Sequence, residues 1–266
     1  MLDFREARSF VGGALVAAGV LGAAWASDAR RRHHRNRRLH RTLVELLLNA
    51  ITAGDAVTAR HSRRVADLTD SLAGALRMGR RERATLRVAS LLHDMGKIDD
   101  RFFDIIHSRA PLTPEQRAEI KAHPHESSDI LAPLEPIHPG ITRIVSSHHE
   151  CWDGSGYPHG WEGERIPLSA RIISVADVFD ALSQPRAYRD ALPPEEVLKK
   201  IREGAGTQFD PQIVALLDRP DVWRCWEGIA RRGWEEERRE QKSGEGGREE
   251  ASAAPAGHGS RGGDGG

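Results

Sequence analysis

Cysteine is scarce in this chain, and so is any excess of one charge. Only Cys151 and Cys225 occur among 266 residues, too few for a disulfide framework, so a reducing compartment is the simpler assumption. Lysine plus arginine and aspartate plus glutamate both number 39, so net charge gives no reason to expect a DNA or RNA duplex as partner. Runs that alternate apolar and polar residues are almost absent. We therefore predict an all-α fold.

Charge is missing altogether from residues 10–26, which are rich in glycine and alanine. This length is at the short end of the ~17–25 residues that span a bilayer. The dense arginine block from Arg30 to Arg41 follows, and such a block holds its side of a membrane in the cytoplasm. We predict that residues 1–38 form an anchor with a basic flank, single-pass in the inner (cytoplasmic) membrane, with the domain that follows in the cytoplasm. The alternatives are a signal peptide and a weakly apolar helix on a cytoplasmic protein.

Apolar residues recur at helical spacing from residue 39 to about residue 235, which predicts one helical domain over 39–235. Expected helices are Leu39–Ala53, Thr58–Met78, Arg81–His93, one starting at Thr113, Ser127–Leu131, Ile141–His149, Ala170–Leu182, Pro193–Glu203 and one starting at Asp210. Thr113, Pro114 and Gln116 form the pattern of a capping box. Beyond Glu236 there is no large apolar residue to bury, so residues 236–266 are predicted to be a disordered tail.

Histidine is abundant, with 13 residues; several stand at expected helix ends, and one of these, His93, is followed directly by an aspartate. A histidine followed by an aspartate can bind one ion through the imidazole and bridge to a second through the carboxylate. Asp177 lies in an apolar helix, where a carboxylate is costly unless it is paired or bound to metal. The candidate ligands are His61, His93, Asp94, His123, His148, His149 and Asp177. Taken singly, each histidine also fits a surface or capping residue, and Asp177 an internal salt bridge. The set suits Fe, Mn, Zn or Ni, and the lack of thiolates argues against a structural zinc.

Several motifs together resemble one known family. They are His61-Ser62-x-x-Val65, His93-Asp94-x-Gly96-Lys97, His123-Pro124, His148-His149-Glu150, Asp153-Gly154-Ser155-Gly156-Tyr157-Pro158, Ala176 to Leu182, Arg186-x-Tyr188-Arg189 and Gly206 to Pro211. In order and spacing, over residues 43–217, the chain resembles the HD-GYP domains. These form a subfamily of the HD metal-dependent phosphohydrolases and hydrolyse cyclic di-GMP.

The resemblance implies an HD-type helical bundle with a centre of two divalent metal ions, Fe or Mn, in its core. His61, His93, Asp94 and Asp177 would hold one ion, and Asp94, His123, His148 and His149 the other. Asp94 and Lys97 would be catalytic. Lys97, Arg186, Arg189, Gly156 and Tyr157 would contact substrate, and Glu150, Asp153 and Asp180 would hold metal-binding side chains in place.

Two departures from the family pattern qualify these expectations. Some members carry a glutamate for a third metal four residues before the first ligand histidine, where this chain has Val57, so we predict two metals. Residues 98–103 depart from the usual Gly-Ile-Pro pattern, which affects the rim of the site and not its ligands.

The expected function is a phosphodiesterase that hydrolyses cyclic di-GMP to linear pGpG, to GMP or to both. The alternatives are a cyclic di-GMP sensor without hydrolytic activity and an HD phosphohydrolase for another nucleotide. A second copy of the chain or a signalling protein is the expected macromolecular partner.

Overall fold

The computed structural model describes residues 42, 44–53, 55–98, 102, 105, 113–185 and 189–252, with side chains described as far as residue 239. The chain divides into two units, residues 1–54 and 55–266. In the first unit, residues 44–53 are helical, within the range predicted. The predicted anchor over residues 10–26 lies outside the described residues. Among the helices that are described, none combines the length and the apolar character that crossing a membrane requires.

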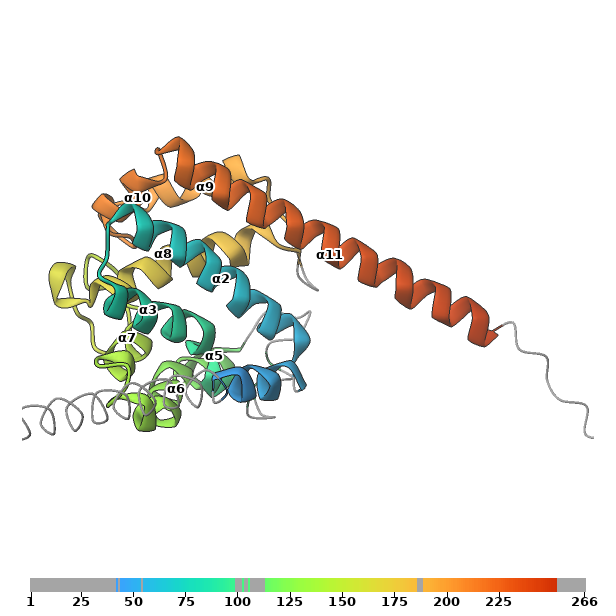
Figure 1. Cartoon of the computed structure of the whole chain (residues 1–266), viewed down its shortest axis with the longest axis horizontal. Helices are drawn as coiled ribbons and strands as arrows, with labels where there is room; N and C mark the ends of the chain where they lie inside the picture. Colours follow the sequence, from blue (N-terminus) through green and yellow to red (C-terminus); the bar gives the residue numbers. More distant parts are fainter. Residues whose placement is uncertain are drawn as a thin grey trace, which may run out of the picture. The chain divides into compact units, whose positions relative to one another are not determined.

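The second unit is helical, and no β-strand occurs among its described residues, which confirms the predicted all-α class (Figure 1). Its α-helices are α2 (Ala56–Ala75), α3 (Arg80–Leu92), α5 (Pro114–Ile120), α6 (His123–Leu131), α7 (Ile141–Ser146), α8 (Leu168–Ser183), α9 (Pro194–Glu203), α10 (Pro211–Leu216) and α11 (Pro220–Ser252). Short 3-10 helices are η1 (Met95–Ile98), η2 (Ala132–Leu134) and η3 (Gly163–Arg165). The capping box predicted at Thr113 starts α5.

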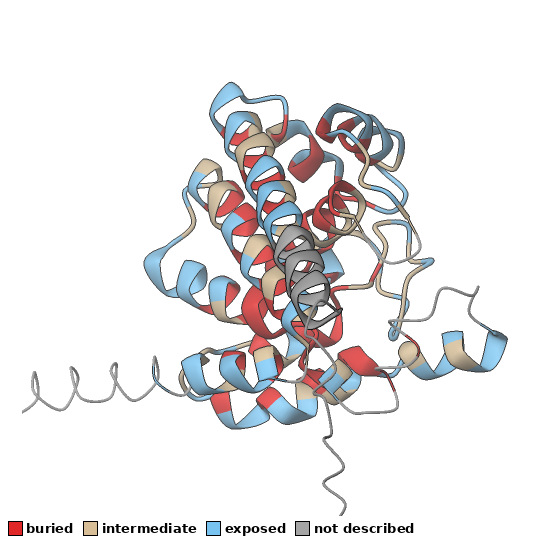
Figure 2. Ribbon diagram, turned by 90° about the vertical axis from the view of Figure 1, so that its right-hand side faces the viewer, coloured by how far each residue is buried: buried red, intermediate tan, exposed pale blue. Residues whose placement is uncertain are grey.

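Helices α2 and α8 form the centre of this unit. Asp55 caps the start of α2: its carboxylate accepts hydrogen bonds from the Val57 backbone and the Thr58 hydroxyl. Helix α2 packs against α3, α8 and α11, and α8 also packs against α7, α9 and α10 (Figure 1). Helix α8 is apolar on most of its surface, as expected for a helix with neighbours on several sides. Buried residues concentrate on the faces that the helices turn toward one another (Figure 2).

Helix α11 was not predicted, and it covers the outer side of α2. The indole of Trp226 is fully buried, contacts the Phe179 ring, and donates a hydrogen bond of 2.8 Å to the hydroxyl of Ser71. The helix continues to Ser252, which differs from the disordered tail predicted from Glu236 onward. At the start of this stretch, the Arg239 guanidinium lies 4.0 Å from the Glu235 carboxylate four residues earlier, and pairs of opposite charge at this spacing stabilise a solvated helix. Residues 253–266 lie outside the described part of the chain.

Candidate metal centre

The seven predicted ligands come together in two groups, formed by residues from five helices or the turns directly after them. His61 and Asp177 lie within α2 and α8, His93 and Asp94 end α3, His123 starts α6, and His148 and His149 follow α7. The first group is His61, His93 and Asp177, and the second is Asp94, His123, His148 and His149. Within each group, one ligand atom from every residue lies within 4.8 Å of the others.

The carboxylate of Asp94 lies between the two groups and is only 5% exposed. Its Oδ2 atom is 3.5 Å from His93 Nε2 and 3.9 Å from His61 Nε2, both of the first group. Its Oδ1 atom is 3.2 Å from His123 Nε2 and 3.9 Å from His148 Nε2, both of the second group. One oxygen therefore faces each group, which is the geometry that a bridging carboxylate requires.

Three ligand histidines are oriented by the same local contact. The Nδ1 atom of each ring donates to the backbone carbonyl three residues earlier: His93 to Ser90 at 2.8 Å, His123 to Ile120 at 2.6 Å, and His148 to Val145 at 2.6 Å. With its proton on Nδ1, a neutral imidazole presents the lone pair of Nε2 on its other side. The helix ends thus fix both the tautomer and the direction of each ligand atom.

The fourth oriented histidine, His61, is held by a carboxylate instead. Its Nδ1 atom is 2.7 Å from Asp180 Oδ2, and its Nε2 atom is 3.0 Å from Asp177 Oδ1. The buried Asp180 is held in turn by Arg64, with Nε 2.6 Å from Oδ1. The structure thus places Asp180 where the sequence prediction put it, against a ligand. Arg64 was missed, although it stands three residues from His61, as Asp180 does from Asp177.

The two groups differ in proton affinity. Burial lowers the pKa of His61, but hydrogen bonds with Asp177 and Asp180 outweigh it and raise the pKa to about 9. Burial lowers the pKa of His149 to about 3, and it also lowers those of His123 and His148. At neutral pH the histidines of the second group are therefore neutral, whereas His61 is protonated on both ring nitrogens and carries a positive charge.

The aspartates of the centre are ionised in spite of their burial. Burial raises the pKa of Asp94, but its electrostatic interactions with His93 and Lys97 and its hydrogen bond with His123 hold it well below its usual range. Burial acts on Asp177 in the same direction, and its hydrogen bond with His61 outweighs it and leaves that pKa well below the usual range. The centre therefore offers anionic carboxylates to a cation.

Metal ions fit these residues on a direct geometric ground. The Nε2 atoms of His123 and His148 lie 3.4 Å apart, and both rings use Nδ1 to donate to a carbonyl. Two neutral rings in this arrangement aim lone pairs at each other, which is unfavourable unless a cation lies between them. In addition, His93 Nε2 is buried without a hydrogen-bond partner. Imidazole and carboxylate ligands without thiolates suit Fe, Mn, Zn or Ni.

Lys97 lies beside the Asp94 carboxylate because η1 packs closely on α6. Its Nζ atom is 2.7 Å from Asp94 Oδ1. The close approach depends on Gly96, whose backbone N–H donates to the Ser127 hydroxyl at 2.8 Å. A Cβ atom at Gly96 would lie 2.6 Å from the carbonyl oxygen of His123, so no larger residue fits there.

The loop Asp153 to Pro158 packs against the second group. The Tyr157 backbone N–H donates to the His149 carbonyl at 3.2 Å, and the two rings stack with centroids 5.0 Å apart. A Cβ atom at Gly156 would lie 2.2 Å from the Cys151 backbone nitrogen, so glycine is required where the loop folds back. Tyr157 therefore lies directly beside a metal ligand, and Gly156 permits its position.

Glu150 and Asp153 differ from their predicted role of holding ligand histidines. The buried Glu150 carboxylate accepts hydrogen bonds from the backbone N–H groups of His159, at 2.7 Å, and Trp161, at 3.1 Å. Asp153 is exposed and accepts from the backbone and hydroxyl of Ser155. Both carboxylates serve the loop because its backbone N–H groups lack partners in regular secondary structure.

Of the two predicted substrate arginines, the structure describes only Arg189. The guanidinium of Arg189 donates to the carbonyl of Ala181, at the end of α8. Arg186 lies outside the described residues. Their predicted contacts with substrate stay predictions.

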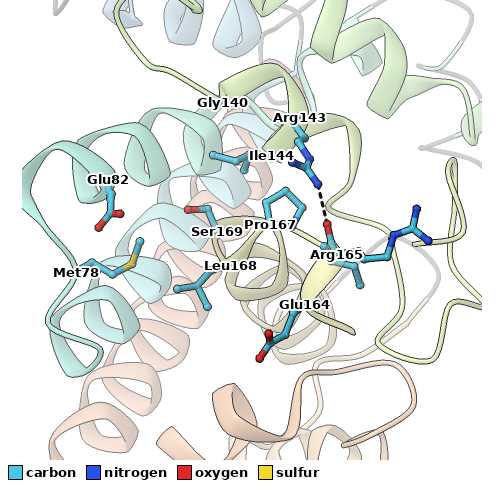
Figure 3. A pocket seen from close by; sticks show the side chains of 11 residues that line it. Met78, Glu82, Gly140, Arg143, Ile144, Glu164, Arg165, Pro167, Leu168 and Ser169 are labelled. Atoms are coloured by element: carbon cyan, nitrogen blue, oxygen red, sulfur yellow. Dashed lines mark hydrogen bonds between the residues drawn. The ribbon is translucent and has the colours of Figure 1, made fainter. Parts of the chain in front are cut away.

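A pocket of about 350 Å³ lies apart from this centre, between the start of α3, the start of α7 and the segment leading into α8 (Figure 3). Arg143 borders it and donates a hydrogen bond of 3.0 Å to the carbonyl of Arg165. None of the seven ligands lines this pocket.

Comparison with known proteins identifies the fold family. Residues 45–213 match the family model described as HD domain, and this range is more than half of the chain. The chain belongs to the HD domain family. Its resemblance to the HD-GYP group is thereby confirmed, together with the HD-type helical bundle.

Curated relatives of this HD domain bear the names of cyclic dinucleotide phosphodiesterases. The 3'3'-cGAMP-specific phosphodiesterase 3 of Vibrio cholerae is 39% identical over 167 residues, 63% of this chain and 36% of that protein. The cyclic di-GMP phosphodiesterase response regulator RpfG of Xanthomonas campestris is 34% identical over 66% of this chain and 47% of that protein. The cyclic di-GMP phosphodiesterase of Thermotoga maritima is 35% identical over 65% and 47%. The chain thus spans less than half of the length of these relatives.

A solved structure agrees with the HD fold. The crystal structure of a cyclic GMP-AMP specific phosphodiesterase of V. cholerae superposes with a TM-score of 0.53, at 21% identity. The match covers 72% of this chain and 52% of that one. At this identity the likeness establishes the fold alone.

Proposed function

We propose that this HD domain is a two-metal phosphodiesterase that hydrolyses cyclic dinucleotides, with cyclic di-GMP as a substrate. The observation that carries the proposal is the placement of Asp94, with one oxygen toward each group of ligands and Lys97 Nζ at 2.7 Å. The names of the relatives support the substrate class, because they act on cyclic di-GMP or on 3'3'-cGAMP.

Two divalent ions held by these groups would supply an activated water and positive charge for the phosphate. Residues of the chain itself bind the phosphate, orient the ligands and exclude solvent. Lys97 offers an ammonium that binds a phosphate oxygen as a point charge. The carbonyls of Ser90, Ile120 and Val145 keep three imidazoles in their ligand orientation. Burial of the ligands excludes bulk solvent, which strengthens each electrostatic contact.

Iron or manganese is the proposed metal, and two ions are proposed instead of three. Imidazole and carboxylate ligands suit both metals. At the position where some HD-GYP members carry a further acidic ligand, this chain has Val57, whose side chain is 47% exposed and has no ligand atom. Each of the two groups contains at least three ligand residues, enough to hold one ion.

Turnover of cyclic di-GMP by the full chain tests the proposal. The protein is loaded anaerobically with Fe(II) or Mn(II), and the products pGpG and GMP are separated by chromatography. We expect hydrolysis by the wild type and none by Asp94→Ala. Binding of cyclic di-GMP without cleavage would contradict the enzyme proposal and establish a sensor. Cleavage restricted to another nucleotide in a panel would overturn the substrate assignment.

A second candidate substrate is 3'3'-cGAMP, because relatives from V. cholerae carry that specificity in their names. Both cyclic dinucleotides share a guanine and two phosphodiester groups, and they differ in the second base. Parallel measurements of kcat/KM with both substrates decide between them. A preference of more than about tenfold corresponds to about 1.4 kcal/mol of differential recognition.

We also propose that residues 10–26 anchor the chain in a membrane. The support is their lack of charge and the arginine block that follows. Fractionation of cells that express the full chain tests this: recovery in the membrane fraction that is lost on deletion of residues 1–38 supports an anchor. Recovery of the full chain in the soluble fraction would contradict it.

A further inference from the structure

Lys121 is a cation at the edge of the metal centre that the functional assignment does not use. It is the residue that ends α5, two positions before the ligand His123, and its side chain is exposed. Its Nζ atom lies 5.2 Å from the centroid of the Tyr157 ring. Tyr157 in turn stacks on the ligand His149 at 5.0 Å. The ammonium therefore lies over the ring that stacks on the candidate metal ligand His149.

The two lysines near the centre have different surroundings. Lys97 Nζ pairs with the bridging carboxylate of Asp94 at 2.7 Å, and its side chain is 18% exposed. Among the described residues, the contact of Lys121 is with the Tyr157 ring, and no carboxylate pairs with it. An ammonium over an aromatic face keeps its charge and most of its donors for another partner. Lys121 is therefore a cation available to an anionic ligand.

The chemistry of the proposed substrate provides such an anion. A cyclic dinucleotide carries two phosphodiester groups on opposite sides of one ring, so both cannot lie at the metal ligands at once. The phosphate to be cleaved belongs at Asp94 and Lys97. The other phosphate must then lie at the edge of the centre, where it needs a cation to replace lost hydration.

We infer that Lys121 binds the phosphate that is not cleaved and so distinguishes cyclic dinucleotides from diesters with one phosphate. This inference rests on the proposed function. It assigns Lys121 to substrate recognition, whereas a structural role would be to cover Tyr157 and keep His149 in place. The two roles predict different results with a small substrate, because only the structural role affects every reaction at the centre.

The test uses the full chain loaded with Mn(II) and two substrates, cyclic di-GMP and the one-phosphate diester bis(p-nitrophenyl) phosphate. The variants are Lys121→Met, which removes the charge and keeps the length, and Lys121→Arg, which keeps the charge. Lys200→Met is the matched control, because Lys200 is an exposed lysine on α9. The readout is the ratio of kcat/KM for cyclic di-GMP to kcat/KM for the small diester. Equilibrium binding of fluorescent cyclic di-GMP is measured in parallel.

In Lys121→Met we expect this ratio to fall at least about tenfold through a higher KM, the factor for one charge-assisted hydrogen bond. Binding of the fluorescent nucleotide should weaken by the same factor. Lys121→Arg should restore most of the ratio, and Lys200→Met should match the wild type.

Three results would overturn the inference: equal losses with both substrates, no loss with either, or no rescue by arginine. If the wild type binds cyclic di-GMP without cleaving either substrate, the proposed enzyme function fails. The binding measurement alone then decides the role of Lys121. A wild type that does not bind the nucleotide overturns both.

Discussion

The two ligand groups of the metal centre contain the same residue types, and they differ in the support of one histidine: His93 of the first group is held by a backbone carbonyl like two histidines of the second, whereas His61 is not. In the second group, His123 and His148 are fixed by backbone carbonyls, and their pKa values are lowered, with burial as the largest cause. In the first group, His61 is fixed by Asp180, whose charge is held by Arg64, and its pKa is raised to about 9. The comparison shows that a carbonyl orients a ligand without charging it, whereas a carboxylate orients it and also stabilises its proton.

This difference predicts unequal metal binding. An ion that enters the first group must displace a proton from His61, whereas the histidines of the second group are neutral near pH 7 and can bind an ion without losing a proton. Once an ion is bound, the Asp180 carboxylate makes His61 a more basic ligand. The first group is therefore the pH-sensitive half of the centre.

Substitution of Asp94 should give the largest loss of metal affinity, and this loss should affect both groups. Asp94→Ala deletes the carboxylate that faces both groups, and Asp94→Asn keeps its shape without its charge. Loss of a supporting residue alone costs about 10–100-fold in metal affinity, so loss of this ligand should exceed about a hundredfold. Isothermal titration with Mn(II) measures it. Tight binding of one ion by Asp94→Ala would show that the groups are independent.

Substitution of Asp180 should weaken the first group alone. Asp180→Asn removes the charge behind His61. Above pH 9, where His61 has no extra proton to displace, we expect about 10–100-fold weaker binding of one of two ions. Asp70→Asn is the matched control, because Asp70 is an acid of α2 that pairs with Arg83 at the surface. Equal weakening of both ions in Asp180→Asn would show that the support of His61 is not specific to its group.

Variation of pH should separate the groups without any mutation. Below pH 9 the raised pKa keeps His61 protonated. The apparent affinity of the first group for its ion should therefore fall about tenfold for each unit of decreasing pH. The affinity of the second group for its ion should change less over the same pH range, because burial lowers the pKa values of its histidines. Calorimetry in buffers of different ionisation enthalpy should detect the release of about one proton when an ion binds to the first group. Release of no proton would contradict the assignment.

The smallest predicted effect concerns the outer wall of the second group. Tyr157→Leu removes the ring stacked on His149 and keeps an apolar side chain. An aromatic pair contributes about 0.5–1.5 kcal/mol. Binding of an ion by the second group should therefore weaken at most about tenfold, while binding by the first group is unchanged. Tyr157→Phe, which keeps the ring, should bind both ions like the wild type. A stronger effect on binding by the first group would show that the loop supports the first group and not the second.

Much of this centre could be predicted from the sequence, because its ligands stand at helix ends or within strongly apolar helices. His93-Asp94 and His148-His149 directly follow apolar helical runs, and Asp177 is a charge inside one. The structure brings all of the predicted ligands together. Helical periodicity likewise gave the helices that carry them, with ends shifted by a few residues.

What the sequence did not reveal depends on contacts between distant segments. Glu150 follows the ligand histidines directly, yet its carboxylate satisfies loop N–H groups nine and eleven residues later. Arg64 gains its role only when α2 meets α8 and places it on Asp180. Helix α11 beyond Glu236 lacks the large apolar residues by which helices are recognised, so this stretch was predicted to be disordered. For Glu150 and Arg64, the position in the chain was known but the partner was not.

The most direct test of the account is the number of Mn(II) ions that the full chain retains after dialysis, measured by mass spectrometry of the metal and by protein concentration. The measurement is made at pH 8.5 and at pH 6, after dialysis against the same free Mn(II) concentration, one that is just enough to fill both groups at pH 8.5. The account predicts two ions per chain at the higher pH and loss of one at the lower pH. Retention of one ion at both values, or equal loss of both ions at pH 6, would contradict a centre of two groups that differ in proton affinity.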